Sequence, residues 1–93
     1  MIDSVSAERH WQVVVDCLVE LHGMSPRLAR QLVDDYLRSM TEAFPGENID
    51  LIYHEEQFDL ANGLAGQSLD WAQHRAAYEH IVQRHYPWVA ARQ

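Results

Sequence analysis

The side chains best suited to chemistry in this sequence are six histidines and fourteen carboxylates, and they are densest at His54-Glu55-Glu56. Imidazole nitrogens and carboxylate oxygens bind zinc, manganese and iron. Consecutive residues on a helix point about 100° apart, however, whereas helical zinc ligands are spaced four residues apart. No two histidines in this sequence have that spacing. We therefore expect no metal or other cofactor. The alternative is a metal or small-ligand site, formed if the fold brings a C-terminal histidine to His54-Glu55-Glu56.

The candidate catalytic side chains have simpler structural explanations. Ser25 and Ser68 each precede a helical pattern and are expected to cap those helices, and no Gly-x-Ser-x-Gly motif occurs. Cys17 borders an apolar stripe, where a cysteine usually behaves as a small hydrophobic residue. Glu55 and Glu56 could perform acid–base chemistry only inside a cleft, which a domain this small seldom forms. We predict that the protein is not an enzyme.

The negative charge of the chain is concentrated in its middle. Between residues 34 and 59, eight carboxylates stand against one arginine, a net charge of −7 that equals the formal charge of the whole chain. The sequence contains no lysine. An acidic segment attracts a basic protein and repels phosphate, and this chain lacks the cations that supply most DNA affinity. We expect a basic protein as partner and no nucleic acid.

Two long helices are predicted in the first half of the chain. The first covers about residues 5–22, and the second begins after the capping Ser25 and covers about 26–43. On the second helix, Asp34 and Asp35 fall on the outward face. The first helix is predicted to bury Trp11, Val14, Val15, Leu18 and Leu21. The second is predicted to bury Leu28 or Ala29, Leu32, Val33, Tyr36, Leu37 and Met40.

Shorter elements are predicted in the second half. A loop at Pro45-Gly46 is followed by a short helical turn over about residues 49–54. A third helix begins with Glu55 and Glu56 and ends at Gly66. Ser68 is expected to cap a last helix over about 69–86, which Pro87 ends. The predicted core residues of this helix are Leu69, Ala72, Ala76, Ile81 and Val82.

These elements predict an all-α fold, a small single-domain bundle of four to five helices over residues 1–93. With 47% apolar residues, the chain can form one modest core as a monomer or a homodimer. No apolar run approaches the roughly 18 residues of a membrane span, and the first residues lack a signal-peptide pattern. We therefore expect a cytoplasmic protein that does not enter a membrane.

The acidic middle also contains Tyr53, a residue type favoured in protein interfaces. If the apolar residues beside it turn inward, Asp50, Tyr53 and His54 turn outward near Asp34 and Asp35. Otherwise Tyr53 belongs to the core and the acids form a solvated face. The predicted partner-binding residues are Asp34, Asp35, Asp50, Tyr53, His54, Glu55 and Glu56.

The segment LVDDYLRSMTE at residues 32–42 is followed by a proline-glycine loop and by DLIYH at residues 50–54. This order of motifs resembles the immunity proteins of nuclease bacteriocins, the colicins and pyocins. Those proteins are small, acidic and helical, and they bind and inhibit a basic DNase. The resemblance implies that Asp50 and Tyr53 are shared anchors. It also implies that Gln31, Asp34 and Asp35 lie on the variable helix that sets partner choice.

The resemblance covers residues 32–54 only. His54 stands where the family has a second tyrosine, and Glu55 stands where it has a proline. From residue 55 onward the sequence is unlike the family. The leading hypothesis is an inhibitor or immunity-type protein of a bacterium. The alternatives are a metal- or small-ligand-binding domain of an uncharacterised bacterial type, and a dimerising structural domain with an apolar patch near Trp88.

Overall fold

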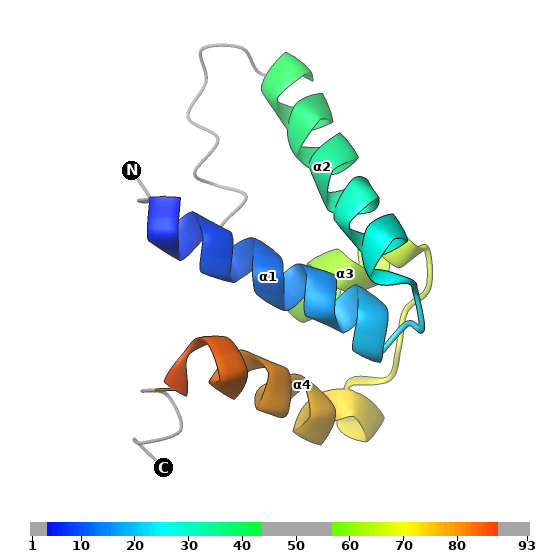
Figure 1. Ribbon diagram of the computed structural model, residues 1–93. Helices are drawn as coiled ribbons and strands as arrows, with labels where there is room; N and C mark the ends of the chain where they lie inside the picture. Colours follow the sequence, from blue (N-terminus) through cyan, green and yellow to red (C-terminus); the bar gives the residue numbers. More distant parts are fainter. Residues whose placement is uncertain (1–3, 44–56, 88–93) are drawn as a thin grey trace.

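The computed structural model describes residues 4–43 and 57–87, which form four α-helices around one core (Figure 1). These two ranges contain no strand, so the predicted all-α fold is confirmed. None of the described helices is both long enough and apolar enough to cross a bilayer. The helices are α1 (Ser4–Glu20), α2 (Pro26–Ala43), α3 (Gln57–Ala65) and α4 (Trp71–His85).

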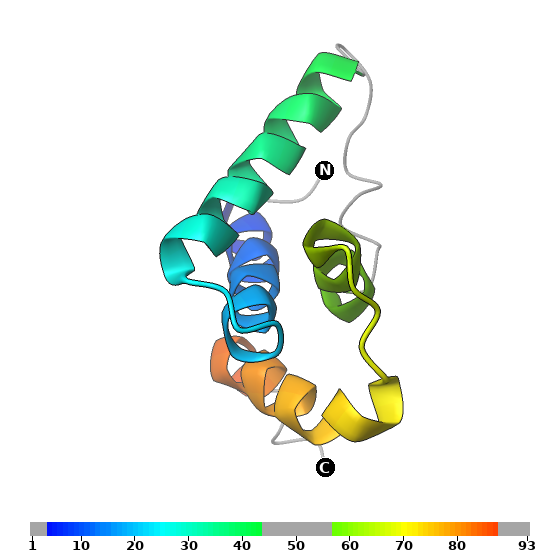
Figure 2. The ribbon, with the colours of Figure 1, turned by 90° about the vertical axis from the view of Figure 1, so that its right-hand side faces the viewer.

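The central element is α1, because α2, α3 and α4 all pack mainly against it. Figure 2, in which α1 is seen nearly end-on, places the other helices on different sides of it. As a result α1 is buried around much of its circumference. Val14 and Leu18, which the sequence assigns to the core, are fully buried, and so are Val13 and Cys17 on its other sides. A helix surrounded in this way needs apolar residues on more than one face.

Aromatic rings connect the outer helices to the core. The ring of Phe58 in α3 lies 5.0 Å from that of Trp71 and 5.5 Å from that of Tyr78, both in α4. On α1, the ring of Trp11 lies 6.0 Å from that of Tyr36 in α2. Edge-to-face and tilted pairs at these distances are favourable beyond the area they bury.

The start of α2 and the end of α3 follow the sequence prediction. The Leu28 N–H donates to Ser25 Oγ at 3.2 Å, which caps α2. Gly66 follows α3 with φ of +70°, a conformation that other residues adopt only with strain. The N–H of Gln67 donates to the carbonyl of Asn62 at 3.1 Å, as expected for a Schellman motif.

The start of α4 differs from the prediction. Ser68 is not its cap, because the helix begins at Trp71 with Asp70 as the N-cap residue. The Gln73 N–H donates to Asp70 Oδ2 at 3.1 Å. Serine and aspartate are equally good caps, so the sequence alone does not decide between two such residues placed two positions apart.

The buried face of α4 also differs from the prediction. Ala72 and Ala76 are exposed, whereas Tyr78 and Ile81 are 5% and 1% exposed. A methyl side chain gains little from burial compared with a tyrosine or isoleucine, so the larger residues fix which side of the helix faces α1. The other predicted core positions, both partly buried, are Leu69 and Val82.

Candidate partner-binding surface

The outward face of α2 carries the described part of the predicted partner-binding surface. Asp34 and Asp35 are exposed, as are Gln31 and Arg38, in agreement with the helical periodicity. Val33, the residue before them, is 1% exposed and packs in the core. Because successive helical residues point about 100° apart, this anchoring turns the two aspartates away from α1.

Charges of opposite sign are segregated along α2. The charged residues between 26 and 33 are both arginines, whereas residues 34–43 carry three carboxylates and one arginine. We call Asp34, Asp35 and Glu42, all exposed, the α2 acidic surface. In chain order the exposed charged residues are Arg27, Arg30, Asp34, Asp35, Arg38 and Glu42.

This order of charges does not stabilise the helix. A helix dipole favours acids near the N-terminus and bases near the C-terminus, and α2 has the reverse. Arg38 Nη1 lies 3.5 Å from Asp35 Oδ1, but both side chains are more than half exposed, and such a pair contributes little. Within the described ranges, Asp34 and Glu42 have no ion-pair partner. These charges therefore contribute little to the stability of α2 itself.

Five of the seven predicted binding residues lie outside the described residues. The same applies to the predicted turn at 49–54 and to Trp88, so the arrangement around Tyr53 stays a prediction. The residues concerned are Asp50, Tyr53, His54, Glu55 and Glu56.

His22 and His74 take part in contacts within the fold. No group of three or more metal-binding side chains forms within the described ranges. His74 Nδ1 donates to the backbone carbonyl of Asp70 at 2.9 Å, while the Asp70 carboxylate caps α4. His22 Nε2 donates to the Oδ1 of the buried Asn62 at 2.9 Å and links the end of α1 to α3.

His10 is a core residue. It is 4% exposed, and its ring meets that of Trp11 edge-on at a centroid distance of 4.7 Å. Burial lowers the pKa of His10 from 6.5 to about 4, because the charged form loses its hydration. His10 is therefore neutral near pH 7.

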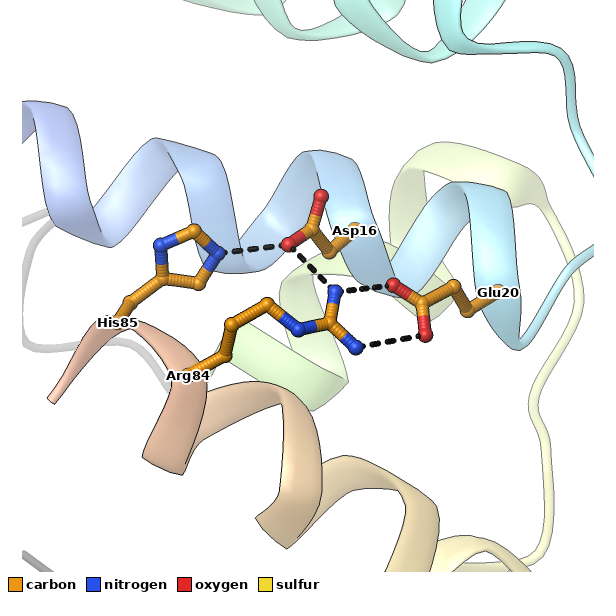
Figure 3. A network of polar contacts seen from close by, with 4 residues as sticks. All are labelled: Asp16, Glu20, Arg84 and His85. Atoms are coloured by element: carbon orange, nitrogen blue, oxygen red, sulfur yellow. Dashed lines mark hydrogen bonds and ion pairs between the residues drawn. The ribbon is translucent and has the colours of Figure 1, made fainter. Parts of the chain in front are cut away.

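A second polar cluster, which the sequence did not predict, joins α1 to the last turn of α4 (Figure 3). Arg84 Nη1 donates to Asp16 Oδ2 at 3.2 Å and to Glu20 Oε2 at 2.5 Å, and Nη2 donates to Glu20 Oε1 at 3.1 Å. His85 Nε2 lies 2.6 Å from Asp16 Oδ2. We call these four residues the α1–α4 ion cluster.

The sequence signal for this cluster is weak. Asp16 and Glu20 are one helical turn apart and share a face of α1, and Arg84-His85 is a cationic pair at the end of α4. The two pairs are separated by 64 to 69 positions in the chain, so periodicity cannot match them. In the fold, the hydrogen bond from Arg84 lowers the pKa of Glu20, and Glu20 raises the pKa of Arg84. Both therefore stay charged around neutral pH.

Comparisons of this chain with protein-family models, with curated proteins and with solved structures gave no match.

Proposed function

We propose that this protein is a small non-catalytic inhibitor of the immunity type, which binds a basic toxin or nuclease in the bacterial cytoplasm. The observation that carries this proposal is the pair of adjacent, exposed carboxylates Asp34 and Asp35 on α2, in a charge order that does not stabilise the helix. Two features of the sequence support it. Residues 34–59 hold a net charge of −7, and residues 32–54 resemble immunity proteins of nuclease bacteriocins.

In the proposed mechanism, one set of residues attracts the basic partner and another set holds it after contact. Exposed carboxylates of the α2 acidic surface steer a basic partner toward the inhibitor and speed the encounter. Asp50 and Tyr53, the anchors implied by the resemblance, hold the partner after contact, because a tyrosine that is buried at an interface contributes much of its binding energy. Inhibition then results from covering the partner, and it requires neither a cofactor nor a chemical step.

The first experiment identifies the partner. Tagged protein is expressed in its bacterial host, and the proteins that copurify at low salt are identified before and after a high-salt wash. We expect a basic protein that is retained at low salt and released at high salt, since screening weakens exposed charge interactions. If no basic protein is retained at low salt, the proposal is wrong.

The second experiment tests the α2 acidic surface on the captured partner. We expect the double variant Asp34→Asn/Asp35→Asn to associate about tenfold more slowly at low salt, with a smaller change in the dissociation rate. Stopped-flow or surface binding measurements give both rates.

The matched control removes two carboxylates outside residues 34–59. The variant Glu8→Gln/Glu79→Gln changes the net charge equally but alters α1 and α4. If this control slows association as much as the α2 variant, only net charge matters, and α2 is not the docking helix.

The anchoring role of Tyr53 is tested on the same captured partner. Tyr53→Ala should mainly speed dissociation of the complex, and an unchanged dissociation rate would show that Tyr53 is not part of the interface.

A further inference from the structure

The last turn of α4 is fastened to α1 by a contact that includes a titratable ring. His85 Nε2 lies 2.6 Å from Asp16 Oδ2 (Figure 3). A carboxylate only accepts hydrogen bonds, so Nε2 carries a hydrogen in this contact. The hydrogen bond is compatible with the neutral ring and with the imidazolium, but only the imidazolium makes it an ion pair.

The charge balance of the α1–α4 ion cluster depends on this ring. Arg84 is shared between two carboxylates, Asp16 and Glu20. With a neutral His85, the four side chains carry a net charge of −1, and protonation of His85 removes it. The side chains of His85 and Asp16 are 21% and 22% exposed, so salt screens their interaction less than that of a fully exposed pair.

Other charged groups surround the cluster. On α4, His80 acts on Glu20 in the same direction as Arg84 and His85 do. On α1, Arg9 acts on Tyr86, the residue after His85. Positive charge at His80 therefore adds to the attraction between the two helices, whereas Arg9 opposes the accumulation of positive charge at this end of α4.

We propose that the His85–Asp16 contact is a pH-sensitive clamp, which holds the last turn of α4 on α1 more tightly when His85 is protonated. Histidine is the side chain that ordinarily changes its charge between about pH 5 and 8. Acidification within this range tightens the clamp, and a rise in pH loosens it. The clamp acts on α4, which lies across α1 from α2 (Figure 1), so it is separate from the α2 acidic surface.

Hydrogen exchange tests the clamp. The Tyr86 N–H donates to the Val82 carbonyl at 2.8 Å and reports on the last turn of α4. Its protection, corrected for intrinsic exchange, should fall about two- to fivefold from about pH 5.5 to about pH 7.5. An amide at a helix end exchanges through local opening, so the effect of His10 on global stability acts on deeply buried amides and not on this one.

Two variants assign the effect to the contact. His85→Gln keeps an N–H donor without a titratable charge, and Asp16→Asn removes the carboxylate. Circular dichroism checks that each variant folds. In both, the protection of the Tyr86 N–H should be independent of pH. A pH-independent protection of this N–H in the unmodified protein overturns the proposal, and so does a fall of the same size in either variant.

His80→Gln separates the two histidines of α4. The clamp predicts that this variant keeps most of the pH dependence, because His80 has no direct hydrogen bond to Asp16 in the cluster. If His80→Gln abolishes the dependence while His85→Gln retains it, His85 is not the titrating group and the proposal fails.

Discussion

Among single residues, His10 has the clearest consequence for stability. Its pKa is about 4 in the folded protein and 6.5 in the unfolded chain, so the unfolded chain binds the proton more readily. The free energy of unfolding should be constant above about pH 6.5 and fall by about 3 kcal/mol as the pH decreases to 4. Urea unfolding at a series of pH values measures this fall.

The variant His10→Gln provides the comparison for this prediction. Glutamine keeps a polar group at the site but does not titrate, so the loss of stability between pH 6.5 and 4 should shrink by most of that amount. His74→Gln, a change on α4, should leave the loss intact. If the unmodified protein and His10→Gln lose stability in parallel, protonation of His10 does not cause the acid sensitivity.

At the residue scale, the sequence predicts which charged side chains are exposed better than it predicts which of them form ion pairs. The outward positions of Asp34 and Asp35 follow from the periodicity of α2, and the structure confirms them. The contacts of Arg84 with Asp16 and Glu20 were not predictable, because they depend on how α4 lies across α1. A sequence gives the face of a helix on which a charge lies, but a distant partner requires the tertiary fold.

At the scale of elements, the cap of α4 offers a direct test. Asp70→Ala removes the carboxylate that accepts from the Gln73 N–H and should cost about 1 kcal/mol of unfolding free energy. Ser68→Ala should change it by less than about 0.5 kcal/mol, because Ser68 precedes the cap and is exposed. Chemical denaturation compares the two variants. A larger cost for Ser68→Ala would restore the sequence-based assignment of the cap.

The predictability of each helix depended on how distinct its signals are. α2 was predicted with the correct bounds because Ser25-Pro26 gives one unambiguous start and Pro45-Gly46 excludes continuation. The Gly66 stop of α3 was equally clear. In α4, two possible caps and several alanines left both the start and the buried face undetermined. Alanine fits either side of a helix, so its spacing carries little information about orientation.

At the scale of the molecule, burial against α1 governs stability. Leu18 is fully buried in the last turn of α1, and Leu18→Ala should lower the unfolding free energy by about 2–5 kcal/mol. Leu28 is 46% exposed at the start of α2, so Leu28→Ala should cost less than about 1 kcal/mol. Urea denaturation of both variants measures the contrast, and equal costs would contradict the central position of α1.

The central position of α1 also has a consequence for protein synthesis. The ribosome makes α1 before any of the helices that cover it, and α4, which supplies Tyr78, Ile81 and the cations for Asp16 and Glu20, comes last of the four. While α4 is still inside the ribosome, the nascent chain therefore exposes the side of α1 that α4 later covers. Chaperones that recognise apolar segments should bind this intermediate and release it when α4 emerges and packs against α1.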